Sequence, residues 1–425
     1  MSSASAKGPG LRAGDLVIHP SFVVGAGYDS NFWRESRYEA SAPVNPVTII
    51  RFGGGVSFAN KNPNKASLNL KLSALGRYAR AEDPDSTVSE MDDAIGLDTA
   101  KANLDLSLLP NKPVTIDLKA DARFSERPGT EVLKEDGYER LIATFGPDLR
   151  FRPGNRPAAR ALELRLGYRF SIDRSLGSAG NLGTVRGDKD THQLAFLTRW
   201  KFFPKTALIL DVKYWLVNYR SGVDLDVNGQ EIDGPDKDLS PLRAESGIQG
   251  LISRRLALTL RGGYTNSYNA DGASYEGAIG RVNIDYTLEP ILKLGLGYVL
   301  KLGDDAFSNY FTLHRGFLRG TVNLPARLTL GGRLGLDYYV YSRDGAPAWS
   351  VGLPDRTEPI MRALAEIGWN PLDWLTMKAS WEFENNRSDF YYCLGESPGR
   401  CFANDPVDLA SYSRHLVMLN IASEY

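Results

Sequence analysis

The chain has few cysteines, histidines and methionines, and it has no long apolar run. Its 425 residues include 2 cysteines, 4 histidines and 5 methionines. No stretch reaches the roughly 18 uninterrupted apolar residues of a membrane-spanning helix. No phosphate loop of the Gly-Lys-Ser/Thr type occurs, and the histidines are scattered over separate segments. We therefore expect neither a helical membrane bundle nor an enzyme, and no cofactor.

An excess of one charge sign is also missing, because 50 lysines and arginines stand against 51 acidic residues. A nearly neutral chain has no broad basic surface, so we expect no nucleic-acid partner. Residues 1–14 lack a basic segment followed by an apolar one, and we interpret them as the start of a mature chain. Glycine, tyrosine and phenylalanine are plentiful, which favours strands and turns over helices.

Apolar and charged residues alternate over many long segments. In residues 162–172 the even positions are apolar, while Glu163, Arg165 and Arg169 occupy odd positions. The same alternation recurs in residues 114–124, 208–216 and 375–384. Successive side chains of a strand point to opposite faces. These lengths suit tilted membrane-crossing strands of roughly 9 to 11 residues, so the sequence predicts strands with one lipid face and one polar face.

Short and long connections alternate along the chain. The short polar turns fall at residues 60–65, 110–113, 153–157, 203–205, 253–255, 289–290, 324–327 and 370–373. The longer connections fall at residues 34–46, 81–92, 127–138, 175–187, 221–240, 343–358 and 389–411. Short turns at one end and long loops at the other are typical of outer-membrane barrels.

The fold prediction is therefore all-β: a single transmembrane antiparallel up-and-down β-barrel of about 18 strands. We assign the barrel to residues 16–425 and a flexible segment to residues 1–15. The short turns would lie in the periplasm and the longer loops outside the cell. The protein is then expected in the outer membrane of a Gram-negative cell, with both termini periplasmic.

The last predicted strand ends the chain on an aromatic residue. Val417, Leu419, Ile421 and Tyr425 share one face of it. This arrangement resembles the C-terminal assembly signal of outer-membrane proteins. The expected partners are the barrel-assembly machinery, outer-membrane lipid and lipopolysaccharide.

The polar face of the strands is expected to line the lumen. The alternation assigns to it Arg51, Lys71, Arg77, Lys101, Lys119, Arg123, Arg165, Arg169, Arg199, Lys213, Arg261, Lys293, Arg315, Arg319, Arg333, Arg362, Lys378, Glu382, Trp215 and Tyr339. Cations outnumber acids on this face, which predicts a lumen that concentrates anions. A second interpretation is that opposite charges on adjacent strands brace the wall through cross-strand pairs. The two interpretations are compatible.

Aromatic residues fall on both faces. On the lumen side, Trp215, Tyr339 and Tyr341 offer rings on which the apolar faces of sugars would stack. On the lipid side, Tyr168, Trp200, Tyr214, Tyr298, Tyr338, Trp369 and Trp381 favour interfacial girdles.

Two predicted features lie in the long loops. Cys393 and Cys401 flank a Pro-Gly turn, and their proximity in an exported chain predicts a disulfide. Asp224, Asp226 and Asn228 match the first half of a calcium loop, but Pro235 stands where the second half requires a bidentate glutamate. A solvated acidic loop is the favoured interpretation, and no other metal site is expected.

The segment Pro20-Ser21-Phe22-Val23-Val24-Gly25-Ala26-Gly27-Tyr28-Asp29-Ser30-Asn31-Phe32 resembles the opening strand of the β-barrel porin 2 family. The resemblance covers this strand alone. It implies a passive conduit that exports a polysaccharide across the outer membrane, like polysaccharide-export barrels of myxobacteria, with a periplasmic export protein and the polysaccharide as partners. Two alternatives stay open: a general diffusion porin for small solutes, and a structural, motility or adhesion barrel with a closed lumen.

Overall fold

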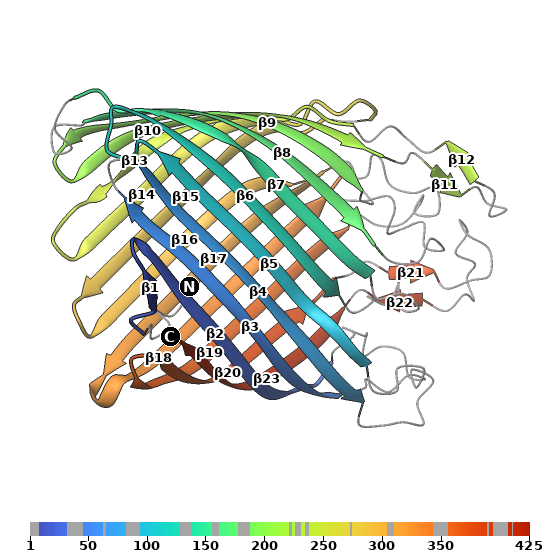
Figure 1. The fold of residues 1–425 in the computed structure, drawn as a ribbon. Helices are drawn as coiled ribbons and strands as arrows, with labels where there is room; N and C mark the ends of the chain where they lie inside the picture. Colours follow the sequence, from blue (N-terminus) through green and yellow to red (C-terminus); the bar gives the residue numbers. More distant parts are fainter. Residues whose placement is uncertain are drawn as a thin grey trace.

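The chain forms a closed antiparallel β-barrel (Figure 1). The computed structural model describes residues 8–31, 46–62, 65–81, 94–127, 138–154, 161–176, 188–220, 223–225, 231–233, 238–272, 274–303, 310–342, 356–388, 391–393, 407–409 and 411–425. One sheet holds 19 strands. The wall consists of 18 of them, since β1 (Leu11–Ala13) is a short additional strand paired with β2 (Leu16–Asp29). The predicted fold class and strand number are confirmed.

The wall strands follow one another around the barrel in chain order. After β2 they are β3 (Val47–Asn62), β4 (Ala66–Ala81), β5 (Ala94–Leu108), β6 (Val114–Arg127), β7 (Tyr138–Phe151), β8 (Leu162–Ser175), β9 (Lys189–Phe203), β10 (Thr206–Tyr219), β13 (Leu242–Leu251), β14 (Leu256–Asn266), β15 (Glu276–Leu288), β16 (Leu292–Gly303), β17 (Phe311–Leu324), β18 (Leu328–Tyr341), β19 (Thr357–Leu372), β20 (Leu375–Asn386) and β23 (Tyr412–Glu424). The barrel closes where β23 pairs with β2, from Ser21 opposite Glu424 to Asp29 opposite Leu416.

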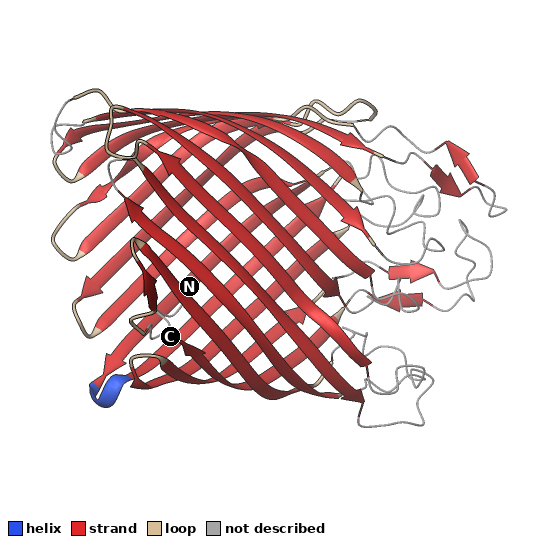
Figure 2. Cartoon of the chain, viewed as in Figure 1, coloured by secondary structure: helices blue, strands red, loops and turns tan. Residues whose placement is uncertain are grey.

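The two ends of the barrel carry different connections (Figure 1). At one end, here called the turn end, β9 and β10 are joined by residues 204–205, and the 3₁₀ turn Pro325–Arg327 joins β17 to β18 (blue in Figure 2). At the other end, called the loop end, the connections are longer. The small sheets β11–β12 (Val223–Leu225 and Glu231–Asp233) and β21–β22 (Tyr391–Cys393 and Val407–Leu409) lie there. Both labelled chain ends lie at the turn end.

Among the described residues, no helix is both long enough and apolar enough to cross a membrane.

The outer face of the wall is apolar on every strand. One large exposed hydrophobic side chain from each wall strand, in chain order, is Phe22, Phe52, Leu72, Leu97, Ile116, Leu149, Leu166, Phe196, Leu210, Ile248, Leu260, Ile284, Leu296, Leu318, Leu334, Ile367, Trp381 and Leu419. Soluble monomers rarely expose apolar patches larger than a few hundred Å². A band that runs around the whole barrel is the surface that lipid requires.

Aromatic side chains mark both ends of this apolar band. Trp200 and Trp369 lie three residues before the turn-end limits of β9 and β19, and both are exposed. Tyr298, Tyr338 and Trp381 are exposed within five residues of the loop-end limits of their strands. Indole and phenol rings favour the boundary between lipid and water. Their placement agrees with the predicted interfacial girdles.

Buried apolar side chains form a small cluster on the inner face, beside the closing pair of strands. Val47 and Ile49 of β3, Ala79 of β4, and Leu416 and Met418 of β23 make up this cluster. It packs against the loop-end half of the seam between β2 and β23. The rest of the described inner face is dominated by polar groups, and these form the candidate functional site.

Candidate functional site

The structure places every sequence-assigned lumen residue on the strand face opposite the exposed apolar side chains. On β8, for example, Arg165 and Arg169 alternate with Leu166, which is 56% exposed on the outer face. On β17, Arg315 and Arg319 likewise alternate with Leu318. The register of the hairpins brings some of these side chains together and separates others, so the face divides into paired and unpaired charges.

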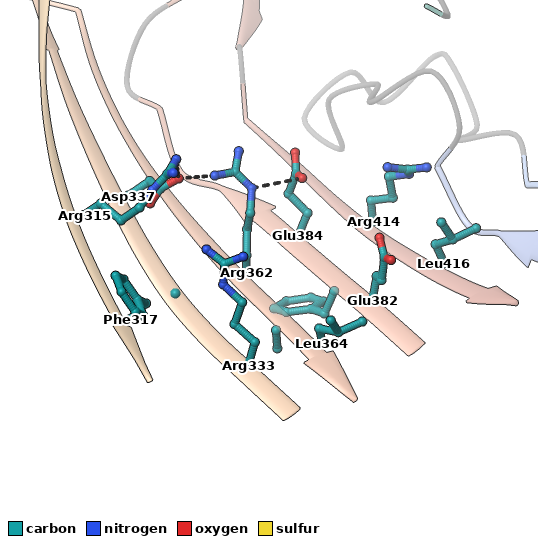
Figure 3. Close-up of a pocket in the computed structure, with 13 residues that line it drawn as sticks. Arg315, Phe317, Arg333, Asp337, Arg362, Leu364, Glu382, Glu384, Arg414 and Leu416 are labelled. Atoms are coloured by element: carbon teal, nitrogen blue, oxygen red, sulfur yellow. Dashed lines mark hydrogen bonds and ion pairs between the residues drawn. The ribbon is translucent and has the colours of Figure 1, made fainter. Parts of the chain in front are cut away.

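One run of paired charges crosses β17, β18, β19 and β20 (Figure 3). Arg315 donates to Asp337 through Nε at 2.6 Å and through a terminal nitrogen at 2.7 Å. Arg362 contacts Asp337 on one side and donates from Nε to Glu384 at 3.2 Å on the other. These alternating charges hold four strands together. They also line an open cavity of about 310 Å³, to which Glu382, Arg333 and Arg414 contribute.

A second paired network crosses β6, β7 and β8. Asp148, which is 4% exposed, accepts from Arg169 at 2.7 Å and lies 3.7 Å from the ammonium of Lys119. Asp117 contacts Arg150, and Arg140 binds Asp173 through two nitrogens. Asp148 thus lies between cations of its two neighbouring strands, while Asp117 and Asp173 each pair with one cation of a neighbouring strand. These contacts show the cross-strand bracing that the sequence suggested.

A third network centres on two acids of β10 and β13. Glu245 is 2% exposed and accepts from Arg243 at 2.5 Å and from Arg281 at 3.1 Å. Asp211 lies 3.4 Å from Lys213 and 3.9 Å from Arg261. Two cations share each carboxylate, so this part of the inner face keeps a positive excess.

Several lumen cations have no carboxylate partner within 4.0 Å in the part of the chain that the structure describes. They are Lys71, Lys101, Arg123, Arg199, Lys293 and Arg333, all assigned to the lumen from the sequence. Lys101 on β5 lies directly opposite Arg123 on β6. Like charges in directly opposed positions destabilise a sheet. A binding site for anions would offset that cost.

A second opposed pair of cations lies on β17 and β18. Arg319 is directly opposite Arg333, and both guanidinium groups lie over the ring of Phe317, at 5.7 and 5.8 Å from its centroid. Arg319 also donates to Asp285 at 2.6 Å, whereas Arg333 has no acid partner among the described residues. The guanidinium of Arg333 therefore remains available to a solute. Figure 3 shows Arg333 and Phe317 on adjacent strands beside the cavity.

Phe317 was not assigned from the sequence, although it shares the alternation of Arg315 and Arg319. Gly297 and Gly335 lie directly opposite it on the flanking strands. The ring occupies the space over Gly297, where an added Cβ would lie 2.3 Å from the Phe317 Cζ atom. The signal was therefore an aromatic residue between two glycines on the same face. It becomes visible only once the hairpin register is known.

The two opposed cation pairs lie almost half-way round the ring from each other. Between β6 and β17 come the eight strands β7–β10 and β13–β16, while β19, β20, β23, β2, β3 and β4 make six in the other direction. Lys101 and Arg123 therefore lie on the opposite side of the lumen from Arg319 and Arg333. An anion that passes between them would be attracted from both sides.

The lumen-side aromatics lie towards the loop end. Phe311, Tyr339 and Tyr341 form one cluster, with ring centroids 5.3 to 6.2 Å apart. The guanidinium of Arg356 lies 4.0 Å from the Tyr341 centroid. Trp215 lies apart from this cluster, in a separate cavity of about 300 Å³. The two aromatics assigned from the sequence, Trp215 and Tyr339, thus belong to different sites.

The predicted assembly residues lie on the outer face of β23. Val417, Leu419 and Ile421 are exposed there, beside the seam with β2. The main chain of Tyr425 is fixed at both polar atoms, since its N–H donates to the carbonyl of Pro20 at 3.0 Å and its carbonyl lies 3.0 Å from Nδ1 of His19. Recognition by the assembly machinery stays a prediction.

Two predictions from the long loops lie outside the described side chains. These are the disulfide between Cys393 and Cys401 and the weak calcium candidate at Asp224, Asp226 and Asn228. Among the described residues, no cluster of three or more metal-ligating side chains occurs.

No family model matches the chain, and no curated protein matches it. The resemblance of residues 20–32 to a polysaccharide-export family is therefore not supported. Among solved structures, the chain is similar to OccK5 (OpdH) of Pseudomonas aeruginosa, with 11% identity, a TM-score of 0.46 and coverage of 96% of this chain and 98% of that one. It is also similar to OccAB4 of Acinetobacter baumannii, with 11% identity and a TM-score of 0.48. OpdO of P. aeruginosa has 12% identity and a TM-score of 0.48. Both comparisons cover 96% of this chain and 98% of the other chain. Likeness at these values assigns neither a family nor a substrate.

Proposed function

We propose that the chain is an outer-membrane channel through which small solutes diffuse passively, with a preference for anions. The apolar outer band supports insertion in a bilayer. Barrels of 16 to 18 strands are wide enough to hold an aqueous passage. The observation that carries the anion preference is the set of lumen cations that have no acid partner among the described residues, above all the opposed Lys101 and Arg123, and Arg333.

The preference for anions would arise from the electrostatic field in the lumen and not from the shape of the lumen. The paired charges, such as Arg315 with Asp337, largely cancel at a distance. The charges of Lys101, Arg123 and Arg333 are not cancelled by an acid partner among the described residues, and in a lumen with low-dielectric walls they raise the local concentration of anions. Passage also requires weak binding, so single charges suit a channel better than a deep chelating site.

The test is the reversal potential of the reconstituted protein under a KCl gradient. The double variant Lys101→Gln/Arg123→Gln should move the reversal potential towards the value for equal permeability of K⁺ and Cl⁻. The matched control is Arg80→Gln, which removes an exposed cation from the outer face of β4 and should leave selectivity unchanged. An unchanged reversal potential in the double variant would refute the assigned origin of the selectivity.

Export of a polysaccharide is the second candidate. The inward cluster of Phe311, Tyr339 and Tyr341 favours it, because stacked rings offer faces to successive sugars. A strain lacking the gene would then lose surface polysaccharide while uptake of small solutes stays normal. Normal polysaccharide with reduced uptake of small anions would exclude export and support the diffusion channel.

A further inference from the structure

Charged side chains also occur on the outer face, where lipid is expected. Arg174 on β8, Asp190 on β9 and Arg220 just after β10 form a cluster on three neighbouring strands at the loop end. Their positions alternate with inward residues and share the face of Leu166, Leu194 and Leu216, which are all exposed to the outside. We call these three residues the rim cluster.

The rim cluster lies just above the apolar band. His192, two residues further into β9, points outward, and its Nδ1 lies 2.8 Å from the hydroxyl of Tyr168. Its ring packs against Phe170, with the centroids 4.9 Å apart. Tyrosine and histidine join an apolar body to a polar edge, and such residues favour the boundary between lipid and water.

The other outward histidines occupy the same position along their strands. His192 is three residues after the first residue of β9, Lys189. His314 is three residues after the start of β17, and His415 is three residues after the start of β23. His314 Nδ1 lies 2.8 Å from the Tyr298 hydroxyl, while His415 packs on Phe383 at 4.9 Å. Each of these strands begins at the loop end, so the three rings indicate where the lipid headgroups begin.

The charge of the rim cluster is unbalanced. Both arginines share one carboxylate: Arg174 contacts Asp190 Oδ1, and the Arg220 Nε donates to Oδ2 at 3.1 Å. Arg174 also donates to the carbonyls of Asp173 and Lys189, at 2.8 and 2.7 Å, which holds it in place. The Arg220 side chain is 61% exposed, and its terminal nitrogens donate no hydrogen bond to a carboxylate in the described part of the chain. The cluster thus presents a fixed and an exposed guanidinium with one net positive charge.

We propose that the rim cluster binds the phosphate of a membrane lipid headgroup. Planar guanidinium groups recognise phosphate through paired, charge-assisted hydrogen bonds. The cluster faces away from the lumen and continues the lipid-facing band, so its ligand reaches it from the membrane and not from the channel. Asp190 orients both arginines and at the same time competes with the phosphate for them.

The test measures lipid retention by native mass spectrometry of the full barrel in neutral detergent. The probes are a matched pair, dioleoyl phosphatidic acid and dioleoylglycerol, which differ by the phosphate. The double variant Arg174→Gln/Arg220→Gln should weaken binding of phosphatidic acid about tenfold, which corresponds to about 1.4 kcal/mol. Binding of dioleoylglycerol should not change. Arg80→Gln is the control, since Arg80 also faces outward near the loop end but lies opposite Thr48 and not a second cation.

A second variant separates binding from folding defects. Asp190→Asn removes the competing carboxylate, so it should strengthen binding of phosphatidic acid, and a merely structural role predicts no such gain. Equal binding by wild type and both variants would overturn the proposal. Displacement of the lipid by inorganic phosphate at equal concentration would also overturn it, because the site would then serve soluble phosphate.

The inference rests on insertion in a membrane but not on conduction. The conductance of Arg174→Gln/Arg220→Gln should equal that of the unsubstituted barrel, because both side chains lie on the outer face. A barrel that binds phosphatidic acid but carries no current would refute the proposed channel and leave the lipid site standing.

Discussion

The ion pair across the closing seam should be one of the most costly contacts to break. Asp29 of β2 is fully buried, and Arg414 of β23 donates from Nε to both of its oxygens at 2.9 Å. Arg414→Gln leaves a buried carboxylate whose one further donor among the described residues is the Asn31 N–H, at 3.2 Å. Breaking a buried pair from one side costs about 3 to 5 kcal/mol, so the free energy of unfolding should fall by that amount.

Substitution of the acid partner, Asp29, should lower the free energy of unfolding by less. In Asp29→Asn, Arg414 loses charge-assisted hydrogen bonds worth about 1.5 to 3 kcal/mol, but it keeps the attraction of Glu384 and Glu382 on β20. The control is Asp373→Asn in the exposed turn pair with Arg327, which should cost under about 1 kcal/mol. Urea titration of the barrel refolded in detergent or lipid measures all three values. Equal costs for Arg414→Gln and Asp373→Asn would show that burial at the seam does not make the Asp29–Arg414 pair more costly to break than an exposed pair.

Three further outcomes are expected. Gly297→Val should displace the Phe317 ring and reduce the preference for anions. The control Gly316→Val should do neither, because a Cβ added at Gly316 meets nothing within 4 Å. Equal effects of the two substitutions on the reversal potential would exclude a role for the ring. Anion preference should be stronger in about 0.1 M than in about 1 M KCl, because the screening length falls from about 10 to about 3 Å, and a preference independent of salt would contradict a field effect. Tyr425→Ala should lower the yield of folded barrel in cells but not refolding in vitro, and loss of both would assign Tyr425 to stability instead of assembly.

The fold was predictable because alternation and turn chemistry agree along nearly the whole chain. Residues 162–172 alternate without a break, and β8 spans Leu162–Ser175. The two-residue turn before β10 consists of the proline and lysine that follow the aromatic residues ending at Phe203, within the turn predicted at residues 203–205. Closure was predictable in outline, since an even number of hairpins brings the last strand back to the first.

The alternation of apolar and polar residues was not sufficient to assign the two faces of β5. The pairing of β4 with β5 shifts at Asp98, since Leu75 pairs with Thr99 while Gly76 pairs with Leu97. Exposed apolar residues occupy odd positions before this bulge, as at Ile95 and Leu97. The bulge also turns Asp98 inward, where it meets Arg51 at 3.0 Å and Arg77 at 3.5 Å. Sequence periodicity does not show an inserted residue of this kind.

The composition of the lumen was predictable, but the pairing of its charges was not. Arg315 and Arg333 have the same residue type and face the same lumen, yet Arg315 binds Asp337 and Arg333 has no acid partner among the described residues. The difference depends on register, which places Asp337 opposite Arg315 and Arg319 opposite Arg333. Register is fixed by the length and geometry of the turn at Pro325–Arg327. The outer rim cluster was not predicted for the same reason, because it joins residues from three neighbouring strands.

We propose an open, anion-preferring passage through a lipid-embedded barrel. The current of the purified protein in a planar bilayer under a KCl gradient tests this proposal. We expect stepwise conductance and a reversal potential whose sign shows that Cl⁻ permeates more readily than K⁺. Absence of current from a barrel shown to be inserted, or a reversal potential that favours K⁺, would contradict it.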